Sequence, residues 1–304
     1  MSGPILITGA TGLLGRAVVG RFSALADRPP VYALVRDPRA AALPPGVQAI
    51  AHDLGDRADP PVGEAPETII HQAQSRCFRD FPNGALDVFE VNVGATQRLL
   101  DWGLRNGVRR FVYLSTGGVY GHGADPFREC DRLPLLPAAS HYIASKRGGE
   151  ALAAAYCGRM IVVILRPFFV YGRGQHPEML IPRLIQRVST GLPLFLQQRD
   201  GLRLNPVHVD DAAGAVLAAA GLDGDATINV AGPEVLSLRE IGGLIGAAVG
   251  RAPRFEVDEA AEPRHLVGDT AAMSRLLLPP RVTLARGLAE MAAAPAGTGL
   301  SHVV

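Results

Sequence analysis

Lysine is almost absent from this chain of 304 residues. Of the 30 basic residues, 29 are arginine and a single one, Lys146, is lysine. Arginine always keeps its charge and spreads it over a plane, whereas lysine is a compact cation whose pKa moves readily on burial. We therefore expect Lys146 to supply chemistry that arginine cannot; the alternative is that its position is chance.

Cysteine, net charge and long apolar runs are also scarce. The three cysteines, Cys77, Cys130 and Cys157, are odd in number and lack metal-ligand spacing, so we expect free thiols in a reducing compartment and no metal. A formal net charge of +1 gives no reason to expect nucleic acid or a membrane surface as partner. No apolar run reaches the length of a membrane span, and the first residues lack a signal-peptide pattern. The expected location is the cytoplasm.

What the sequence does contain is an alternation of short apolar runs with amphipathic stretches. This pattern is typical of βαβ units on a parallel sheet. Strands are expected at residues 4–8, 31–35, 47–51, 68–71, 111–115, 161–166, 206–208 and 227–230. Helices are expected at about 85–105, 142–158, 178–190, 237–249 and 282–293, with others after residues 12 and 210.

A glycine-rich segment, Thr8 to Gly15, lies between the first expected strand and a helix. Gly9 permits a tight turn, Gly12 lets the backbone approach a pyrophosphate, and Gly15 lets helix and strand pack closely. The N–H groups at the start of the helix would bind phosphates. We predict a dinucleotide site with these cofactor contacts: Gly9, Thr11, Gly12, Leu13, Leu14 and Gly15.

The expected architecture is therefore an α/β fold, a Rossmann-type doubly wound parallel sheet with a small discontinuous C-terminal lobe. We assign residues 1–171 and 202–231 to the NAD(P)-binding domain. Residues 172–201 and 232–294 are assigned to a substrate-binding lobe, and 295–304 to a flexible tail.

Tyr142 and Lys146 are one helical turn apart, so their side chains share a helix face. A phenol with a pKa near 10 is a poor acid–base group at neutral pH, and a neighbouring ammonium is expected to lower that pKa. With six tyrosines in the chain, a lone lysine falls four places after one of them in only about 2% of random placements. We predict that the pair handles protons.

Taken together, these motifs resemble the extended short-chain dehydrogenase/reductase superfamily, the NAD-dependent epimerase/dehydratase family. Further segments carry the resemblance: His71-Gln72-Ala73, Asn92-Val93-Gly94-Ala95-Thr96, Ser115-Thr116-Gly117-Gly118-Val119-Tyr120-Gly121, Leu165-Arg166-Pro167 and His208-Val209-Asp210-Asp211. The resemblance implies that Thr116 holds the substrate oxygen and that Lys146 also binds the cofactor ribose. It implies a homodimer built on the helices that carry Asn92 and Tyr142.

Other roles follow from the same resemblance. Asn92 would support a water-mediated proton path to Lys146; the alternative is a buried helix asparagine that only bonds backbone. Asp53 and Leu54 would flank the adenine, and Ala73 would line the cofactor cleft. His71 and His208 are expected to be structural.

The choice of cofactor is expected at the end of the second strand. Arg36 stands where an arginine accommodates the 2′-phosphate of NADP, and Arg16 follows the glycine segment. Asp37 could instead face the ribose of NAD, and both arginines could be solvated surface residues. NADP(H) is favoured and NAD(H) remains possible.

The reaction expected is hydride transfer between nicotinamide and a small-molecule secondary alcohol or ketone. Family members that dehydrate carry Asp-Glu after the catalytic threonine; here Gly117 and Gly118 stand there, which argues against dehydration. One alternative is epimerisation of a nucleotide sugar through transient oxidation. The other is a catalytically silent cofactor-sensing protein.

Residues expected near the substrate are Ser115, Gly117, Phe168, Phe169 and Arg203. Nucleotide-binding relatives often have asparagine where Phe169 stands and arginine at the neighbour of Arg203, where this chain has leucine. Both changes remove polar groups from the expected diphosphate contact. A less polar substrate, another mode of nucleotide binding, or two core phenylalanines would each explain them.

Overall fold

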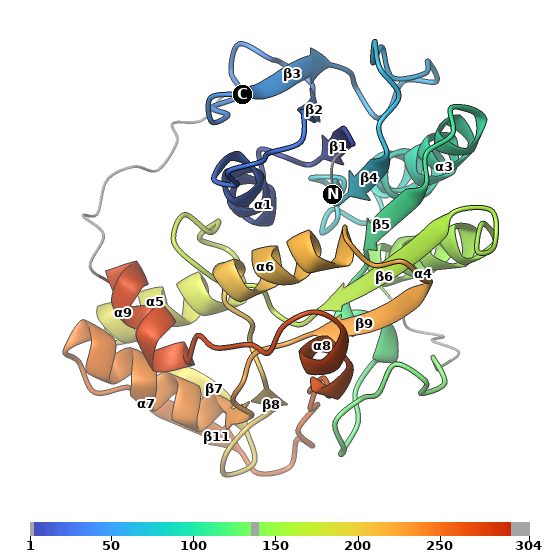
Figure 1. The fold of residues 1–304 in the computed structure, drawn as a ribbon. Coiled ribbons are helices and arrows are strands. Elements are labelled where there is room, and N and C mark those ends of the chain that lie inside the picture. The colour runs from blue at the N-terminus through green and yellow to red at the C-terminus, as the bar shows by residue number, and fades with distance from the viewer. Residues whose placement is uncertain (1–2, 135–139, 293–304) are drawn as a thin grey trace.

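The computed structural model describes residues 3–134 and 140–292. Its centre is a parallel sheet with the strand order β3-β2-β1-β4-β5-β6-β9 (Figure 1). The strands are β1 (Ile5–Thr8), β2 (Val31–Val35), β3 (Val47–Ala51), β4 (Thr68–His71), β5 (Arg110–Leu114), β6 (Ile161–Pro167) and β9 (Ala226–Val230). This confirms the expected fold class. The order reverses between β1 and β4, and in such sheets ligands bind at the reversal.

Helices cover both faces of the sheet. On one face lie α1 (Leu13–Ser23) and α6 (Val209–Ala219), and on the other α3 (Ala95–Arg105) and α4 (His141–Ala154) (Figure 1). Side chains alternate between the faces along each strand, so Ile7 packs in the core beneath α1 and α6 while Leu6 packs beneath α3. Burial on both faces explains why the strands read as continuous apolar runs.

A smaller lobe is built from α5 (Leu180–Thr190), α7 (Leu238–Val249) and α9 (Leu284–Ala292). Two short sheets accompany them: β7 (Leu194–Gln197) pairs with β11 (Phe255–Asp258), and β8 (Arg203–Leu204) with β10 (Leu236–Ser237). The short α8 (Ala271–Leu276) lies against β9. The domain boundaries stay a prediction, and β8, in a segment assigned to the larger domain, pairs with a strand of the lobe.

Two expected elements differ in the structure. The helix expected at 85–105 is α2 (Ala85–Phe89), a π-helical turn η1 (Glu90–Gly94) and α3. The Thr96 hydroxyl donates to the Asn92 carbonyl at 2.7 Å, which helps to satisfy the widened turn. Residues 206–208 form no strand. The nearest strand is β8, which ends at Leu204, and His208 forms only an isolated bridge with Tyr171.

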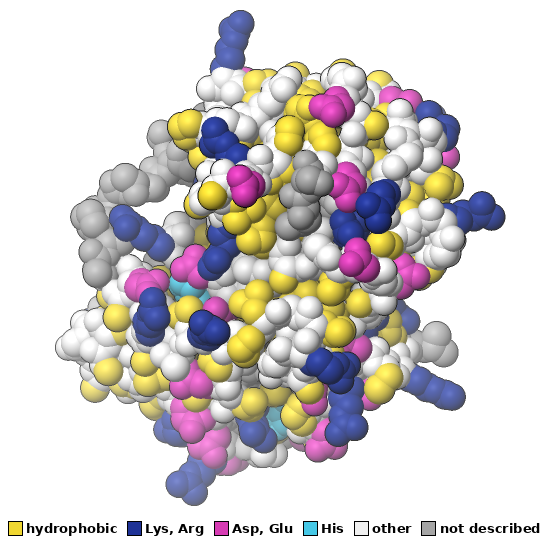
Figure 2. All heavy atoms as spheres, viewed as in Figure 1, with side chains coloured by type: hydrophobic (Ala, Val, Ile, Leu, Met, Phe, Trp, Pro, Cys, Tyr) yellow, Lys and Arg dark blue, Asp and Glu magenta, His cyan; other side chains and the backbone are white. Residues whose placement is uncertain are grey.

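The face drawn in Figure 2 carries basic and acidic side chains interspersed, without a field of one sign. Within residues 3–134 and 140–292, no helix combines the length and apolar character needed to cross a bilayer. The tail expected at 295–304 lies outside the described residues.

Candidate active site

The glycine-rich segment forms a tight turn from β1 into α1. Gly9 has a left-handed backbone (φ 71°) and its carbonyl accepts the Gly12 N–H at 3.1 Å. A Cβ on Gly15 would lie 2.0 Å from the Gly9 carbonyl oxygen, so only glycine fits there. Helix α1 begins after Gly12 without a side-chain cap. Its first N–H groups are therefore available to a phosphate, which fits a dinucleotide.

The residues expected around the adenosine end lie after β2 and β3. Arg36 and Asp37 are both exposed, and the Asp37 carboxylate accepts the Arg39 N–H at 2.9 Å. Asp53 is exposed too and accepts the Gly55 N–H at 2.9 Å. Two loop carboxylates thus stabilise their own turns, and Arg36 is exposed directly after β2.

Tyr142 lies near the start of α4 and meets the loop that follows β4. Its hydroxyl donates to Gln74 Oε1 at 3.1 Å, and its ring centroid lies 5.2 Å from that of Phe78. Burial raises the pKa of Tyr142 to about 12, while the adjacent Thr116 hydroxyl acts in the opposite direction. The structure thus brings Thr116 and Tyr142 together, as expected.

Lys146 does not lower the pKa of Tyr142 in this structure, so that physical expectation is wrong here. The buried Lys146 ammonium donates to the Leu114 carbonyl at 2.8 Å and lies 5.4 Å from the Tyr113 ring centroid. Burial lowers the pKa of Lys146 to about 8, and the carboxylate of Glu150 opposes this shift. Because the ammonium is bonded to the end of β5, it is not shared with the phenol.

The buried lysine predicts a specific pH dependence of stability. In the unfolded chain the pKa of Lys146 returns to about 10.5, so between pH 8 and 10.5 the unfolded state binds the extra proton. The free energy of unfolding, relative to Lys146→Met, should therefore rise with pH across this window, by about 1 kcal/mol per pH unit. Urea unfolding of both proteins between pH 7 and 10 measures the difference; a difference independent of pH would contradict the buried charge.

Asn92 links three segments around the catalytic helix. Its Oδ1 accepts the Ser75 N–H at 2.9 Å, and its Nδ2 donates to the Ser145 hydroxyl at 2.9 Å. Ser145 in turn donates to the Tyr142 carbonyl at 2.7 Å. Asn92 lies in the π-helical turn, and such turns are frequent at functional sites. These bonds position α4; the proton path to Lys146 stays a prediction.

His71 joins β4 to its neighbours. Its Nδ1 lies 2.8 Å from the Thr8 hydroxyl and its Nε2 lies 3.0 Å from the Thr96 hydroxyl. Complete burial lowers the pKa of His71 to about 3, so the imidazole is neutral. Ala73, two residues later, donates its N–H to the Thr8 hydroxyl at 3.1 Å. This arrangement fixes the spacing of β1 and β4.

The residues expected near the substrate have different surroundings in the structure. Phe168 is a buried core residue whose ring lies where a Cβ on Gly117 would need to be. Phe169, half-buried, has a left-handed backbone (φ 46°), which is rare for a bulky residue and is typical of functional sites. Ser115 is buried, and its hydroxyl has no hydrogen-bond partner among the described residues. Arg203 is exposed and lies on β8.

Sequence reasoning missed the loop that covers Tyr142. A cavity of about 550 Å³ beside the phenol is lined by Phe78, Arg79, Phe81, Ser140, His141 and Tyr142. Arg79 donates to the Glu178 carbonyl at 3.1 Å, so this loop reaches the segment before α5. Beyond Ala73 the loop carries no periodicity or motif, and no signal in the sequence places it there.

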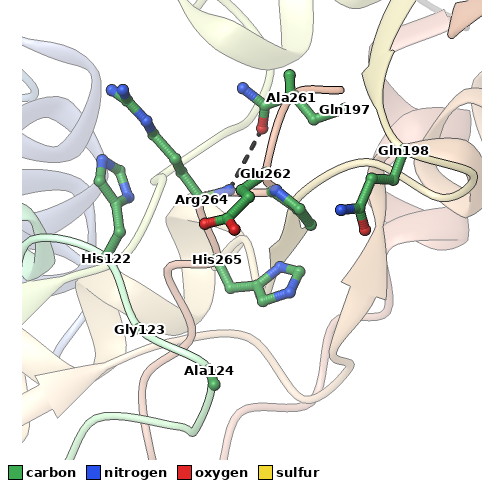
Figure 3. A pocket seen from close by; sticks show the side chains of 10 residues that line it. His122, Gly123, Ala124, Gln197, Gln198, Ala261, Glu262, Arg264 and His265 are labelled. Atoms are coloured by element: carbon green, nitrogen blue, oxygen red, sulfur yellow. Dashed lines mark hydrogen bonds between the residues drawn. The ribbon is translucent and has the colours of Figure 1, made fainter. Parts of the chain in front are cut away.

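A second hollow, of about 680 Å³, lies between residues 122–124 and the lobe segments 197–198 and 261–265. Figure 3 shows Gln197, Arg264 and His265 around it, with the Arg264 N–H donating to Gln197 Oε1 at 3.3 Å. Its remaining lining residues are His122, Gly123, Ala124, Gln198, Ala261, Glu262 and Pro263. It contains none of the residues expected at the site.

One group of potential metal ligands joins the start of α6 to α9. His208, Asp210 and Glu290 present atoms within 4.8 Å of one another. His208 Nδ1 already accepts the Asp210 N–H at 3.3 Å and caps α6. The expectation that the chain uses no metal stays an expectation.

Comparison with known proteins places this geometry in a family. The model of the NAD dependent epimerase/dehydratase family matches residues 5–231. A dTDP-glucose 4,6-dehydratase of Streptomyces griseus is 32% identical, over 96% of this chain and 94% of that protein. MoeE5 in complex with UDP-glucuronic acid and NAD has a TM-score of 0.78 at 27% identity, covering 95% and 98% of the chains. DesIV, a dTDP-glucose 4,6-dehydratase from Streptomyces venezuelae with NAD and TYD bound, has a TM-score of 0.77 at 28% identity, covering 95% of both.

These findings correct two expectations. The argument against dehydration is not supported, since two of the three relatives are named dehydratases. The preference for NADP is not supported either, because both solved relatives hold NAD. The recognition from sequence motifs is confirmed, and the fold and the matched residues agree on it. The chain belongs to the NAD-dependent epimerase/dehydratase family.

Proposed function

We propose that this chain uses bound NAD(P) to oxidise a hydroxyl carbon of a nucleotide sugar to a ketone, with Tyr142 as acid and base. The observation that carries the proposal is the meeting of Tyr142 with Thr116 at the end of β5. Lys146 is bonded to the last residue of the same strand. The glycine turn opens at the same edge of the sheet, where a dinucleotide would reach these groups.

The chain's own residues hold the reactants and move one proton. The N–H groups of Leu13 and Leu14 at the start of α1 would hold the diphosphate, and Lys146 the cofactor ribose. The substrate hydroxyl would replace Gln74 as the partner of the Tyr142 phenol and would also contact Thr116. When bound, the nicotinamide supplies the hydride acceptor. As the C–H bond of the carbinol gives up hydride, its O–H proton passes to Tyr142 Oη.

The pKa of about 12 for Tyr142 favours the protonated phenol, which can donate a proton but cannot accept one. At neutral pH Tyr142 is protonated, so it can donate its proton to a ketone oxygen. For alcohol oxidation it must first become phenolate, and an ammonium turned from Leu114 toward the phenol would favour that form. Lys146, with its pKa of about 8, is mostly ammonium at neutral pH and would supply that charge, while the phenol proton leaves to solvent.

A nucleotide sugar is supported as substrate by the relatives. MoeE5 is described in complex with UDP-glucuronic acid, and the relatives named dehydratases act on dTDP-glucose by name. The cavity beside Tyr142 offers two phenylalanine rings, the Arg79 guanidinium and the His141 imidazole. Apolar ring faces with a few polar groups are the usual lining of a sugar-sized ligand site.

The step after oxidation separates the candidates. Return of hydride to the opposite face of the ketone gives an epimer, and this route needs no further acid–base group. Dehydration is the second candidate, favoured by the names of two relatives. It requires proton abstraction beside the ketone, and Gly117 and Gly118 provide no carboxylate for it.

The product distinguishes these candidates. The purified protein would be incubated with UDP-glucose, UDP-glucuronic acid or dTDP-glucose, with NAD and NADP in separate reactions. An epimerase forms a product of unchanged mass and a dehydratase a product lighter by one water, both without net reduced cofactor. A simple dehydrogenase accumulates reduced cofactor in proportion to product. We expect the epimer.

The same assay settles the cofactor. If Arg36 accommodates a 2′-phosphate, NADP will support turnover at lower concentration than NAD; the NAD-bound relatives support the reverse order. Binding of either cofactor without turnover of any sugar would contradict the proposed reaction and support the cofactor-sensing alternative.

A further inference from the structure

Gln72 carries a buried amide that has no partner in the part of the chain that the structure describes. It follows β4 directly, and neither its Oε1 nor its Nε2 has a hydrogen-bond partner within residues 3–134 and 140–292, although both atoms are buried. A buried unpaired amide lowers stability, so such a group in a folded protein calls for an explanation. One explanation is a ligand whose hydrogen-bond donors and acceptors match those of the Gln72 amide.

The surroundings of Gln72 place it at the reversal point of the sheet. A Cβ on Gly9 would lie 2.8 Å from the Ala73 nitrogen and 3.0 Å from the Gln72 carbonyl carbon. The backbone of Gln72 is therefore packed against the first glycine of the phosphate-binding turn. His71 is bonded to Thr96 on the α3 side, so alternation directs Gln72 toward the α1 side.

Two other orphaned polar atoms follow neighbouring strands. The Ser115 hydroxyl comes directly after β5, and Gln175 Oε1 belongs to the loop after β6. Gln175 Nε2 donates to the Val170 carbonyl at 2.7 Å, so only its oxygen is free among the described residues. The unpaired groups of Gln72 and Ser115 thus lie at the carboxyl ends of β4 and β5, which is the ligand-binding edge of such a sheet.

We propose that the Gln72 amide binds the nicotinamide-side ribose of the dinucleotide cofactor. The adenosine half belongs to the ends of β2 and β3, and the diphosphate to the turn after β1. The reacting ring must lie beside Tyr142 and Thr116, beyond β5. Because β4 is between β1 and β5, the ribose that joins diphosphate to nicotinamide passes over Gln72. The amide offers one acceptor and two donors, which match the hydroxyls of a diol.

This inference rests on the proposed function. Binding measurements with parts of the cofactor test the inference separately from that function. ADP lacks the nicotinamide-side ribose, ADP-ribose has it, and NAD has both ribose and ring. Replacing Gln72 with Leu should weaken binding of ADP-ribose and NAD about tenfold, the loss of one or two hydrogen bonds. Binding of ADP should be unchanged. Titration calorimetry measures all three.

A second readout excludes a purely structural role. Because the amide is unpaired without cofactor, Gln72→Leu should unfold at the same or a higher temperature than the wild type when no ligand is present. Its stabilisation by saturating NAD should be smaller. Gln72→Asn keeps the amide but shortens its reach, and should show the same selective loss. The control is Gln48→Leu on β3, an exposed glutamine that should change none of these values.

Several outcomes would overturn the inference. Equal affinity of wild type and Gln72→Leu for NAD would show that the amide makes no contact. Equal weakening of ADP and ADP-ribose would indicate distortion of the glycine turn, and a lower unfolding temperature without ligand would show that the amide is paired within the protein. If the wild type binds ADP-ribose and NAD but converts no sugar, the proposed function fails while the inference stands. If it binds neither, both fail.

Discussion

Replacing Tyr142 with Phe is expected to lower kcat by about a thousandfold, since the variant loses the group that gives and takes the proton. General acid–base catalysis by a positioned side chain contributes roughly 10² to 10⁴ in rate. The change removes one oxygen and keeps the ring that packs against Phe78. The fold and the dissociation constant for NAD should therefore change little. Steady-state kinetics with the sugar found active, together with calorimetry for NAD, measure both.

The control for this prediction is Tyr156→Phe, beyond the end of the same helix. Its hydroxyl accepts from Gln97 Nε2 at 2.8 Å, away from the cleft. That variant also loses one phenolic hydrogen bond, but kcat should remain within about twofold, because Phe keeps the packing of the half-buried ring and Tyr156 takes no part in the proposed chemistry. A Tyr142→Phe enzyme with normal kcat would remove Tyr142 from the chemistry.

The cofactor turn and the core could be predicted from the sequence because each depends on local constraints. Gly9 needs a positive φ and Gly15 has a backbone oxygen where a Cβ would be. Such requirements appear directly as glycine at fixed spacing. The apolar strands are equally direct, since a parallel sheet covered on both faces needs continuous apolar runs. The placement of Tyr142 and Lys146 one turn apart on the same helix follows from helical geometry alone.

The loop over Tyr142 could not be predicted, because its contacts join residues distant in the sequence. Gln74 meets Tyr142 across 68 positions, and nothing in the composition of the loop indicates that partner. The direction of the Lys146 ammonium was missed for a similar reason. Helix periodicity predicts a shared face for Tyr142 and Lys146. It gives no sign that the Leu114 carbonyl at the end of β5 binds the Lys146 ammonium.

The small strands of the lobe were missed because they are short and pair over long separations. β8 and β10 have two residues each, and β7 pairs with β11 across about sixty positions. Short strands with mixed burial give no clear alternation. The π-helical turn at Asn92 was missed as well, because its residues have the sequence pattern of an ordinary helix. In the structure, Asn92 in this turn bonds to Ser75 and Ser145, which are distant in the sequence.

Replacing Glu150 with Gln is expected to cost about 3 to 5 kcal/mol in the free energy of unfolding, because it leaves a buried guanidinium without its counter-charge. Glu150 on α4 makes a two-bond pair with Arg166 on β6, at 2.7 and 3.0 Å, and each side chain is 8% exposed. Arg166 also donates to the Tyr120 hydroxyl at 2.7 Å. The pair therefore joins the catalytic helix to the sheet, and urea unfolding measures its loss.

An exposed ion pair and a double replacement make this prediction specific. Asp101→Asn breaks the pair with Arg105, whose side chains are 54% and 52% exposed, and should cost far less than Glu150→Gln because water screens an exposed pair. Replacing Glu150 with Leu and Arg166 with Met together removes both charges, and stability should return to within about 2 kcal/mol of the wild type. If Glu150→Gln costs no more than Asp101→Asn, the pair is not what holds α4 on the sheet. If the double variant is as unstable as the single one, shape rather than the uncompensated charge sets the cost.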